Sequence, residues 1–276
     1  MNYVIISDIH SNIETLEKYR DKLEHYAQSK QLVFAGDYID GYHQETGAGV
    51  KVLQFIKELE DAGAIVLLGN HDLVFLRALG YQTPKSMQKM HFEHWLQIGG
   101  EESLMSWANH FIPTFKQRYQ LLEALINRHS LYEFENFIHK YMGDLVEWLN
   151  NHEYYHQDDK LFISHAGVDL NKSLQDQTID DLIWTRHEMF DNSLTYEEVH
   201  PDWRDKVFVF GHTPTMYIHD YKNIQDDNPY SVYKPDGHIT MYDIDAGSHS
   251  GYRTSHLNLL EINSQGQVSN IEFLQV

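Results

Sequence analysis

Five short apolar segments of this chain each end in side chains that can bind metal ions or transfer protons. The segments read "IISDIHSN", "VFAGDYID", "LLGNHD", "FISHAG" and "FVFGHT". Any one of these endings could be a plain turn, because Gly and Asn are common turn formers. Five in succession are hard to explain as turns alone. The pattern favours a catalytic site built from loops that follow strands.

The residue types in these loops predict a site for two metal ions. Asp8 and His10, two apart on an extended segment, can project to the same side and hold one cation. Asp37 offers a carboxylate, whose two oxygens can bridge two cations. An amide oxygen and two imidazole nitrogens complete the expected ligands, from Asn70, His165 and His212. Two metals about 3.5–4 Å apart would neutralise a phosphoryl group and convert a bridging water to hydroxide.

His71 is expected to act beside the metals, because it neighbours Asn70 without being a needed ligand. As an imidazolium it could donate a proton to a leaving alkoxide or a hydrogen bond to the phosphoryl group. Asp40, three residues after Asp37, could accept from the other ring nitrogen and fix the tautomer. A carboxylate at this position could also serve only to cap the loop.

The elements that must position these residues alternate between strand and helix. Strands are expected over Met1–Ser7, "QLVFAGD", "AIVLLGNHD", "KLFISHAG" and "KVFVFGHTP". Asn12 is expected to cap a helix with Ile13, Leu16, Tyr19 and Leu23 on one face, and Gly49–Glu60 reads as another helix. The alternation predicts an α/β fold, a sheet flanked by helices with polar loops along one edge. After Gly237, "HITMYDID", "HLNLLEI" and "NIEFLQV" predict an antiparallel meander.

Residues from about 80 to 157 interrupt this alternation. They are rich in aromatic residues, Gln, Glu and His, and the one Gly-Gly pair, Gly99-Gly100, is expected to form a loop between two helices. We interpret the segment as a mainly helical insertion that could cover a site. The expected organisation is one domain over residues 1–276 that carries this insertion.

Composition restricts the partners. The chain has 276 residues, with 41 Asp and Glu against 21 Lys and Arg, for a formal net charge of −20. Such a charge disfavours polymeric nucleic acid and anionic membranes as partners. It also repels phosphorylated substrates unless bound metal cations reverse the local sign. The chain has no cysteine, its first residues do not resemble a signal peptide, and no apolar run approaches about 20 residues, so a cytoplasmic protein is expected.

The order of the motifs resembles that of the calcineurin-like metallophosphoesterases. The similarity is greatest to the branch of the serine/threonine phosphatases and bacterial diadenosine tetraphosphatases. It covers almost the whole chain and rests on Asp8-x-His10, Gly36-Asp37-x-x-Asp40, Gly69-Asn70-His71-Asp72, His165 and Gly211-His212-Thr213, with "WLQIGGEESL", "SHAGV", "LIWTR" and "DIDAGS" as secondary blocks. The resemblance implies a four-layer α-β-β-α sandwich and two divalent metals, with Asp37 as the bridge and His71 as the acid.

The sequence departs from this family's pattern at the second motif. An arginine that binds the substrate phosphate usually follows the second aspartate, whereas this chain has Gly41 there. The loss removes a bidentate phosphate clamp. Arg186 in "LIWTR" is the best remaining candidate for phosphate binding, although it could equally belong to a salt-bridged surface. Arg77 is the second candidate. The third motif ends in Asp72, where protein phosphatases usually have Glu.

These observations predict a dinuclear-metal phosphohydrolase. The first expectation is a phosphomonoesterase, with serine/threonine phosphoprotein as one substrate class. The alternative is a dinucleoside polyphosphate hydrolase, and a phosphodiesterase or an inactive binding module remains open. Mn is the first expectation for the metals, with Fe or Zn as alternatives, because His, Asp and Asn ligands suit all three. The expected partner is a phosphorylated small molecule, a nucleotide or a phosphoprotein.

Overall fold

The first sheet is built around the N-terminal strand. The computed structural model describes residues 1–41, 46–190, 195–218, 230–234, 239–250 and 256–275. In it, β1 (Asn2–Ile6), β2 (Gln31–Ala35) and β3 (Ile65–Leu67) run parallel, and β9 (Leu257–Asn263) and β10 (Val268–Leu274) continue the sheet antiparallel on the other side of β1. β1 therefore lies at the centre of the sheet, with a hydrogen-bonded neighbour on each edge.

The second sheet also has a parallel centre. β5 (Leu161–Ser164), β6 (Val207–Phe210) and β8 (Ile239–Asp243) run parallel, and β4 (Tyr155–Asp158) and β7 (Tyr230–Lys234) flank them antiparallel. β5 and β6 are buried along their length, as expected of strands covered on both faces, whereas β8 alternates between buried and partly exposed residues.

The predicted antiparallel meander after Gly237 is confirmed for its last two strands, which pair antiparallel as β9 and β10, and is wrong for its first strand. Strands form at the three predicted runs, but β8 joins the second sheet parallel to β6, whereas β9 and β10 join the first sheet. Alternation of apolar and polar residues specifies which face of a strand is buried. It does not specify the neighbouring strand, which depends here on the packing of two sheets.

Helices cover the outer faces of both sheets. They are α1 (Ile13–Lys18), α2 (Arg20–Ser29) and α3 (Ala48–Asp61) on the first sheet, and α9 (Ile179–Ile183) and α10 (His187–Phe190) on the second. Asn12 caps α1 as predicted, by accepting from the backbone N–H of Thr15 at 3.2 Å. The single predicted helix after Asn12 is instead divided into α1 and α2, because Tyr19 leaves the helical conformation at φ −106° and ψ 16°.

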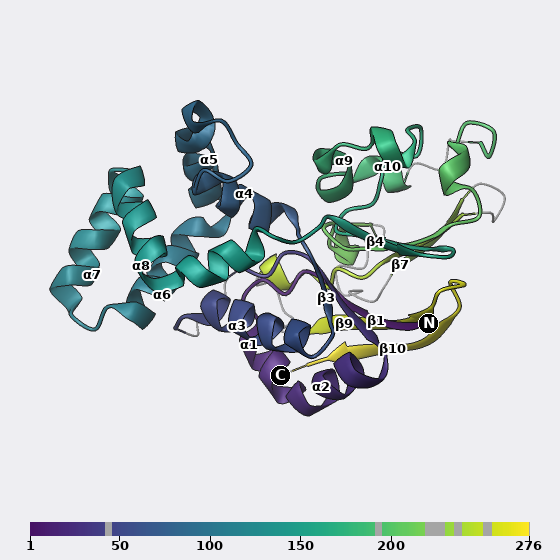
Figure 1. Cartoon of the computed structure of the whole chain (residues 1–276), viewed down its shortest axis with the longest axis horizontal. Coiled ribbons are helices and arrows are strands. Elements are labelled where there is room, and N and C mark those ends of the chain that lie inside the picture. The colour runs from purple at the N-terminus through teal and green to yellow at the C-terminus, as the bar shows by residue number, and fades with distance from the viewer. Residues whose placement is uncertain (42–45, 191–194, 219–229, 235–238, 251–255, 276) are drawn as a thin grey trace.

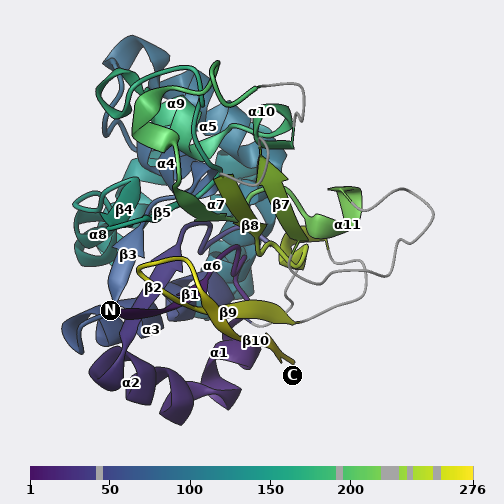
Figure 2. The same ribbon diagram turned by 90° about the vertical axis from the view of Figure 1, so that its right-hand side faces the viewer.

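Three apolar cores separate the four layers. Neighbouring residues of β1 divide between two of them, since Ile5 lies in the core between the sheets and Val4 in the core beneath α1–α3. Phe208 of β6 lies in the third core, beneath α9 and α10. Figures 1 and 2 show the same order, with α1–α3 on one side of the strands and α9 and α10 on the other. The fold is the expected α-β-β-α sandwich.

The segment after β3 is mainly helical. It contains α4 (Asn70–Ala78), α5 (Gln88–Trp95), α6 (Glu101–Phe111), α7 (Phe115–Leu122) and α8 (Leu131–Leu149), which extend to one side of the sheets in Figure 1. The expected insertion at about 80–157 contains α5 to α8, and β4 begins at Tyr155. The predicted Gly-Gly loop is a π-helical turn, Leu96–Gly100, in which Gly99 has a φ of 128°.

A cluster of buried aromatic rings fixes the insertion to α4. Phe75 of α4 lies 5.1 Å from Trp95 of α5 and 5.5 Å from Trp107 of α6, measured between ring centroids. Phe134 of α8 packs against the rings of Phe75 and Trp95. These helices are therefore attached to the helix that begins with Asn70 and His71.

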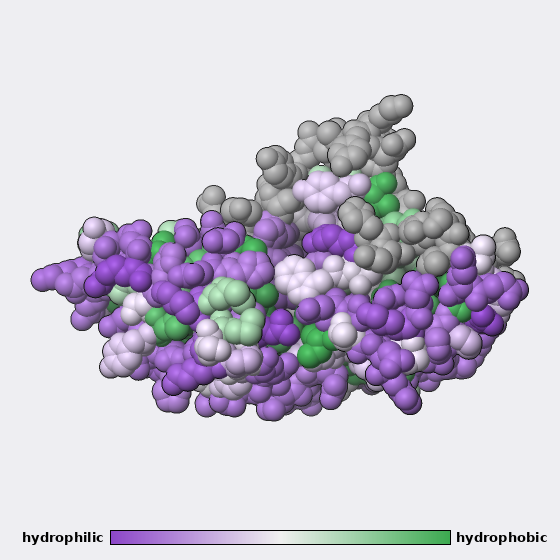
Figure 3. Space-filling model, turned by 90° about the horizontal axis from the view of Figure 1, so that it is seen from above, coloured by the Kyte–Doolittle hydropathy of each residue, from purple (hydrophilic) through white to green (hydrophobic). Residues whose placement is uncertain are grey.

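The surface of the described residues is mostly polar. Figure 3 shows hydrophilic residues over most of the coloured part of one face, with apolar residues in small separate patches. Among the helices of the described ranges, none is both long enough and apolar enough to span a membrane.

Candidate active site

Loops that follow five strands meet at one edge of the two sheets. The backbone N–H of Asp8 donates to the carbonyl of Gly36 (3.1 Å), and that of Gly211 donates to the carbonyl of His165 (2.8 Å). A pocket of about 620 Å³ opens over the loops. The structure thus brings together the side chains predicted as metal ligands, which are Asp8, His10, Asp37, Asn70, His165 and His212.

Two glycines permit this close approach. A Cβ atom at Gly36, whose φ is 95°, would lie 2.5 Å from the backbone nitrogen of Gly69. A Cβ atom at Gly211 would lie 1.9 Å from Oδ2 of Asp8. Both distances are far shorter than nonbonded contacts, so any other residue at either position would separate the loops.

Several of the predicted site residues have a left-handed backbone conformation. Their φ values lie between 46° and 68°, in Asp8, His10, Asp37, Asp40 and His212. Positive φ is uncommon outside glycine and gathers at functional sites, where surrounding contacts hold it in place. The loops are therefore shaped by their mutual hydrogen bonds as well as by local preference.

Asp8, His10 and Asp37 form one group of possible metal ligands, with ligand atoms within 4.8 Å of one another. Nε2 of His10 lies 3.8 Å from Oδ1 of Asp8 and 3.6 Å from Oδ2 of Asp37. Nδ1 of the same ring donates to the carbonyl of Asp40 at 2.6 Å, which leaves a lone pair on Nε2. Burial lowers the pKa of His10 well below its usual value, so the ring is neutral and able to bind a metal.

Asp37, His165 and His212 form a second such group. Nδ1 of His165 donates to the carbonyl of Ala35 at 3.0 Å, and its Nε2 lies 3.2 Å from Oδ2 of Asp37 and 2.9 Å from Oδ1 of Asn70. Nε2 of His212 is buried and has no hydrogen-bond partner among the residues that the structure describes. Asp37 belongs to both groups and lies between them.

The charges and the unpaired imidazole fit a cation at this site. A buried polar atom without a partner is costly unless something binds it. Burial raises the pKa of Asp8 to about 6. Burial would lower the pKa of His165, but the charges of Asp37 and Asp8 raise it to about 10. The carboxylates thus attract positive charge, which a proton on His165 or a metal ion can supply.

His71 lies at the start of α4 and faces the pocket. Its backbone N–H donates to Oδ1 of Asp37 at 2.9 Å, and its Nδ1 lies 3.1 Å from Oδ2 of Asp40. Burial lowers its pKa, but the charges of Asp37 and Asp40 outweigh this and raise the pKa to about 9. The ring is therefore protonated at neutral pH, which is the form a general acid requires.

Asp40 is enclosed by the insertion, a contact that the sequence did not reveal. Its side chain is fully buried. Nε1 of Trp95 donates to Oδ2 at 2.9 Å, and Oγ of Ser103 donates to Oδ1 at 2.6 Å. With His71, three donors hold this carboxylate. Both insertion residues lie in or beside "WLQIGGEESL", so the motif was visible although its partner was not.

Asp72 braces two of the loops. Its carboxylate accepts from the backbone N–H groups of Asp37 (2.8 Å), Tyr38 (3.1 Å) and Gly69 (3.0 Å). Burial and the charge of Asp37 raise the pKa of Asp72 to about 7. The residue therefore supports the position of Asp37 and does not line the pocket.

Of the two candidate arginines, the structure places Arg186 at the pocket. Nη1 of Arg186 donates to the carbonyl of His212 at 2.7 Å and to Oγ1 of Thr213 at 3.2 Å. Arg77 instead lies 3.9 Å from Asp180 and is not among the residues that line the described pocket. At Gly41, a Cβ atom would lie 2.2 Å from the carbonyl oxygen of His10, so the loop has no room for an arginine there.

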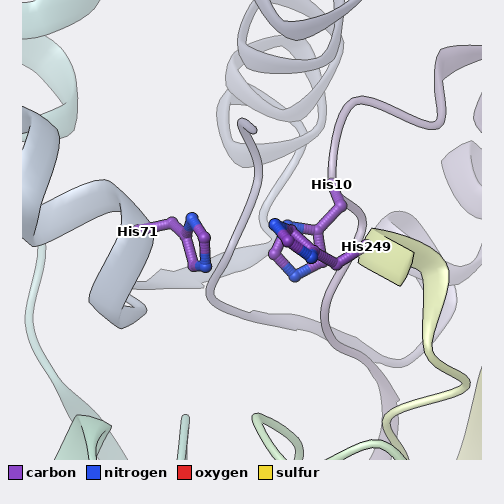
Figure 4. A group of neighbouring side chains, drawn as sticks. All are labelled: His10, His71 and His249. Atoms are coloured by element: carbon purple, nitrogen blue, oxygen red, sulfur yellow. The ribbon is translucent and has the colours of Figure 1, made fainter. Parts of the chain in front are cut away.

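His249 also lines the pocket, in a 3₁₀ turn over Ser248–Ser250. Its ring centroid lies 4.7 Å from that of His10 and 5.0 Å from that of His71. Figure 4 shows the ring of His71 pointing from its helix toward the other two rings. The residue directly follows the block "DIDAGS", but nothing in the local sequence indicates its place in the pocket.

Comparisons with known proteins agree with the fold. The model of the calcineurin-like phosphoesterase family matches residues 1–240. A solved protein described as a diadenosine tetraphosphatase is similar, with a TM-score of 0.54, 16% identity and coverage of 99% of this chain and 93% of that one. Proteins with a curated function include none that matches this sequence.

Two further structures are similar at low identity. A cold-active protein-tyrosine phosphatase from a psychrophile Shewanella species has a TM-score of 0.50 at 16% identity, over 99% of this chain and 80% of that one. A metallophosphoesterase from Sphaerobacter thermophilus has a TM-score of 0.50 at 12% identity, over 100% and 88%. At these identities the structural likenesses show the fold alone.

Proposed function

The chain belongs to the family of calcineurin-like phosphoesterases, and we propose that it is a phosphomonoesterase that uses two divalent metal ions. Asp8, His10 and Asp37 would hold one ion, and Asp37, Asn70, His165 and His212 the other. Mn is the first expectation, with Fe or Zn as alternatives, because carboxylate, amide and imidazole donors suit all three.

The observation that carries this proposal is the position of Asp37. It is the residue shared by two groups of possible ligands, each with ligand atoms within 4.8 Å of one another. A carboxylate has two oxygens and can bind two cations at once. When bound, the two ions would neutralise the phosphoryl group and lower the pKa of the water that attacks it.

The chain's own residues would supply the proton and orient the substrate. His71, with its pKa raised to about 9, donates a proton to the oxygen of the leaving alcohol. Asp40 accepts from Nδ1 of His71 and keeps Nε2 directed at the substrate. Arg186 lines the pocket, where its planar guanidinium can donate hydrogen bonds to a phosphoryl oxygen.

The charge around the pocket supports a substrate with one phosphate. Among the lining residues in the described part of the chain, Arg186 is the only Lys or Arg, whereas Glu101 and Glu102 are both present. Carboxylates near the opening repel additional phosphates, which disfavours the alternative of a dinucleoside polyphosphate. An uncharged or basic leaving group is compatible with them, so a phosphopeptide with basic residues is the favoured macromolecular substrate.

The test is hydrolysis by metal-stripped protein, with and without added Mn²⁺. The substrates are a basic serine phosphopeptide, diadenosine tetraphosphate and bis(p-nitrophenyl) phosphate. We expect Mn-dependent turnover that is fastest on the phosphopeptide. The variant Asp37→Asn should lose turnover and bind less Mn, while Asp21→Asn, an exposed carboxylate of α2, should behave as the parent.

Other outcomes would change the proposal in defined ways. Faster turnover of diadenosine tetraphosphate would identify the dinucleotide hydrolase, and faster turnover of the diester a phosphodiesterase. If two Mn²⁺ ions bind but none of the three substrates is hydrolysed, the chain is a binding module on this fold.

A further inference from the structure

His249 lines the pocket, but the mechanism proposed above gives it no role. Its ring contacts His10, an expected metal ligand, and His71, the expected acid. The three imidazoles have ligand atoms within 4.8 Å of one another, and Figure 4 shows them grouped beside the start of α4. A side chain so close to both groups lies within reach of any phosphoryl group that they act upon.

The turn that carries His249 is held from two directions. Oγ of the neighbouring Ser248 donates to the carbonyl of Ile9 at 3.3 Å, in the loop that also carries Asp8 and His10. Nε2 of His249 itself lies 3.3 Å from the carbonyl of Ile98, in the turn between α5 and α6. The ring is therefore positioned between the loop after β1 and the insertion.

The hydrogen bond to Ile98 is long and easily exchanged. A distance of 3.3 Å exceeds the usual N–H···O range. A phosphoryl oxygen carries negative charge and accepts a hydrogen bond about twice as strongly as a neutral carbonyl. The ring N–H of His249 can therefore exchange its hydrogen bond to the carbonyl of Ile98 for one to a phosphoryl oxygen. This exchange needs no change in the protonation of the ring.

On the side of the pocket beside His10, the proposed site otherwise lacks a hydrogen-bond donor for a phosphoryl oxygen. Arg186 approaches from the side of His212, whose carbonyl it binds. On the side of His10, no side chain fits at Gly41, because a Cβ atom there would lie 2.2 Å from the carbonyl oxygen of His10. Nδ1 of His10 already donates to the backbone carbonyl of Asp40. In the proposed mechanism, His10 binds a metal ion and His71 is the acid, so His249 is the one of the three imidazoles that can bind the substrate.

We infer that His249 is a substrate-binding residue that donates a hydrogen bond to a phosphoryl oxygen, opposite Arg186. The inference rests on the proposed phosphomonoesterase and adds to its site a residue that the sequence motifs do not include. A third metal ion on the same three imidazoles is the competing explanation. Such an ion would bind His10, which could then no longer share an ion with Asp8 and Asp37. It would also bind His71, which could then no longer act as the acid.

The experiment compares His249→Ala and His249→Asn with the parent protein, all loaded with Mn²⁺. The readouts are the inhibition constant of inorganic phosphate, the KM and kcat for p-nitrophenyl phosphate, and the number of Mn²⁺ ions bound. For His249→Ala we expect the phosphate inhibition constant and the KM to rise about tenfold, with bound Mn²⁺ unchanged. The Asn amide can still donate, so His249→Asn should recover part of the loss. His25→Ala, an exposed histidine of α2, is the matched control.

Two results would overturn the inference while leaving the proposed function intact. One is an unchanged phosphate inhibition constant in His249→Ala. The other is a loss of bound Mn²⁺ from that variant, which would instead mark His249 as a metal ligand. Failure of the proposed function is seen separately, since the parent protein would then neither hydrolyse p-nitrophenyl phosphate nor bind inorganic phosphate.

Discussion

Nδ1 of His71 lies 3.1 Å from Oδ2 of Asp40, and the side chain of Asp40 is completely buried. Water cannot take the place of any donor to this carboxylate. Its hydrogen bonds come from His71, Trp95 and Ser103, and the last two belong to the insertion. The insertion is therefore part of the wall that orients the proposed acid, and the site depends on its correct packing.

Replacing Asp40 by Asn should slow the reaction without removing metal. The neutral amide neither orients His71 in the same way nor stabilises its protonated form. We expect kcat for an alkyl phosphate to fall about 10²–10⁴-fold. The loss should be smaller with p-nitrophenyl phosphate, because p-nitrophenolate leaves without a proton. Steady-state kinetics on both substrates, with Asp21→Asn as control, measures this difference. An equal decrease in kcat on the two substrates would contradict the proposal that Asp40 acts by orienting His71.

Replacing Trp95 by Phe should destabilise the protein through one hydrogen bond. The change keeps an aromatic ring but removes the N–H that donates to Asp40, and loss of a buried partner costs about 1–3 kcal/mol. Trp107→Phe is the matched control. Trp107 is buried in the same cluster, yet its Nε1 has no hydrogen-bond partner within the described ranges. Urea unfolding should show the larger loss for Trp95→Phe, and similar losses would mean that packing alone explains both.

Replacing Arg186 by Ala should weaken substrate binding. The guanidinium lines the pocket beside His212, so we expect KM for a phosphomonoester to rise about tenfold or more, since hydrogen bonds to charged groups contribute about 1.5–3 kcal/mol. Arg77→Ala is the control, because Arg77 pairs with Asp180 outside the pocket. Bound Mn²⁺ must be counted in both variants. If Arg186→Ala binds less Mn²⁺ than the parent, Arg186 acts mainly by positioning His212, whose carbonyl it binds, and not by binding phosphate.

Removing the metals should lower the stability of the folded protein as well as its activity. The site gathers buried carboxylates, and burial raises the pKa of Asp8 to about 6, so a bound cation stabilises them. At a free metal concentration of 100 times Kd, binding to one site adds about 2.7 kcal/mol. Thermal unfolding with chelator and with graded Mn²⁺ tests this, and a midpoint that does not rise with Mn²⁺ would exclude binding by the native state.

The sequence was informative about the loops because each motif is local. Asp8 and His10, or Asn70 and His71, are close in the chain and follow a recognisable apolar run. Their convergence also follows from topology, since parallel strands present their carboxyl ends at one edge. The convergence of these side chains at one edge could therefore be anticipated from the chain itself, whereas the four layers of the sandwich were implied only by the family resemblance.

The supporting contacts could not be predicted in the same way, because their partners are distant in sequence. Asp40 meets Ser103, which is 63 positions later in the chain, and Trp95, which is 55 positions later. Nothing local distinguishes Asp72, which braces two loops, from an ordinary first-turn acid of a helix. His249 follows a block with no obvious ligand spacing. Such contacts depend on how the insertion and the C-terminal strands pack.

The place of β9 beside β1 has a consequence for the order of synthesis. β1 carries the loop with Asp8 and His10, yet one of its two hydrogen-bonded neighbours is made more than two hundred residues later. While the chain emerges from the ribosome, β1 can pair with β2 but has an open edge until Leu257–Asn263 arrives. The second sheet, with His165 and His212, also forms late. A nascent chain therefore acquires its proposed hydrolytic activity only after Leu257–Asn263 has been made, when the insertion has had time to fold.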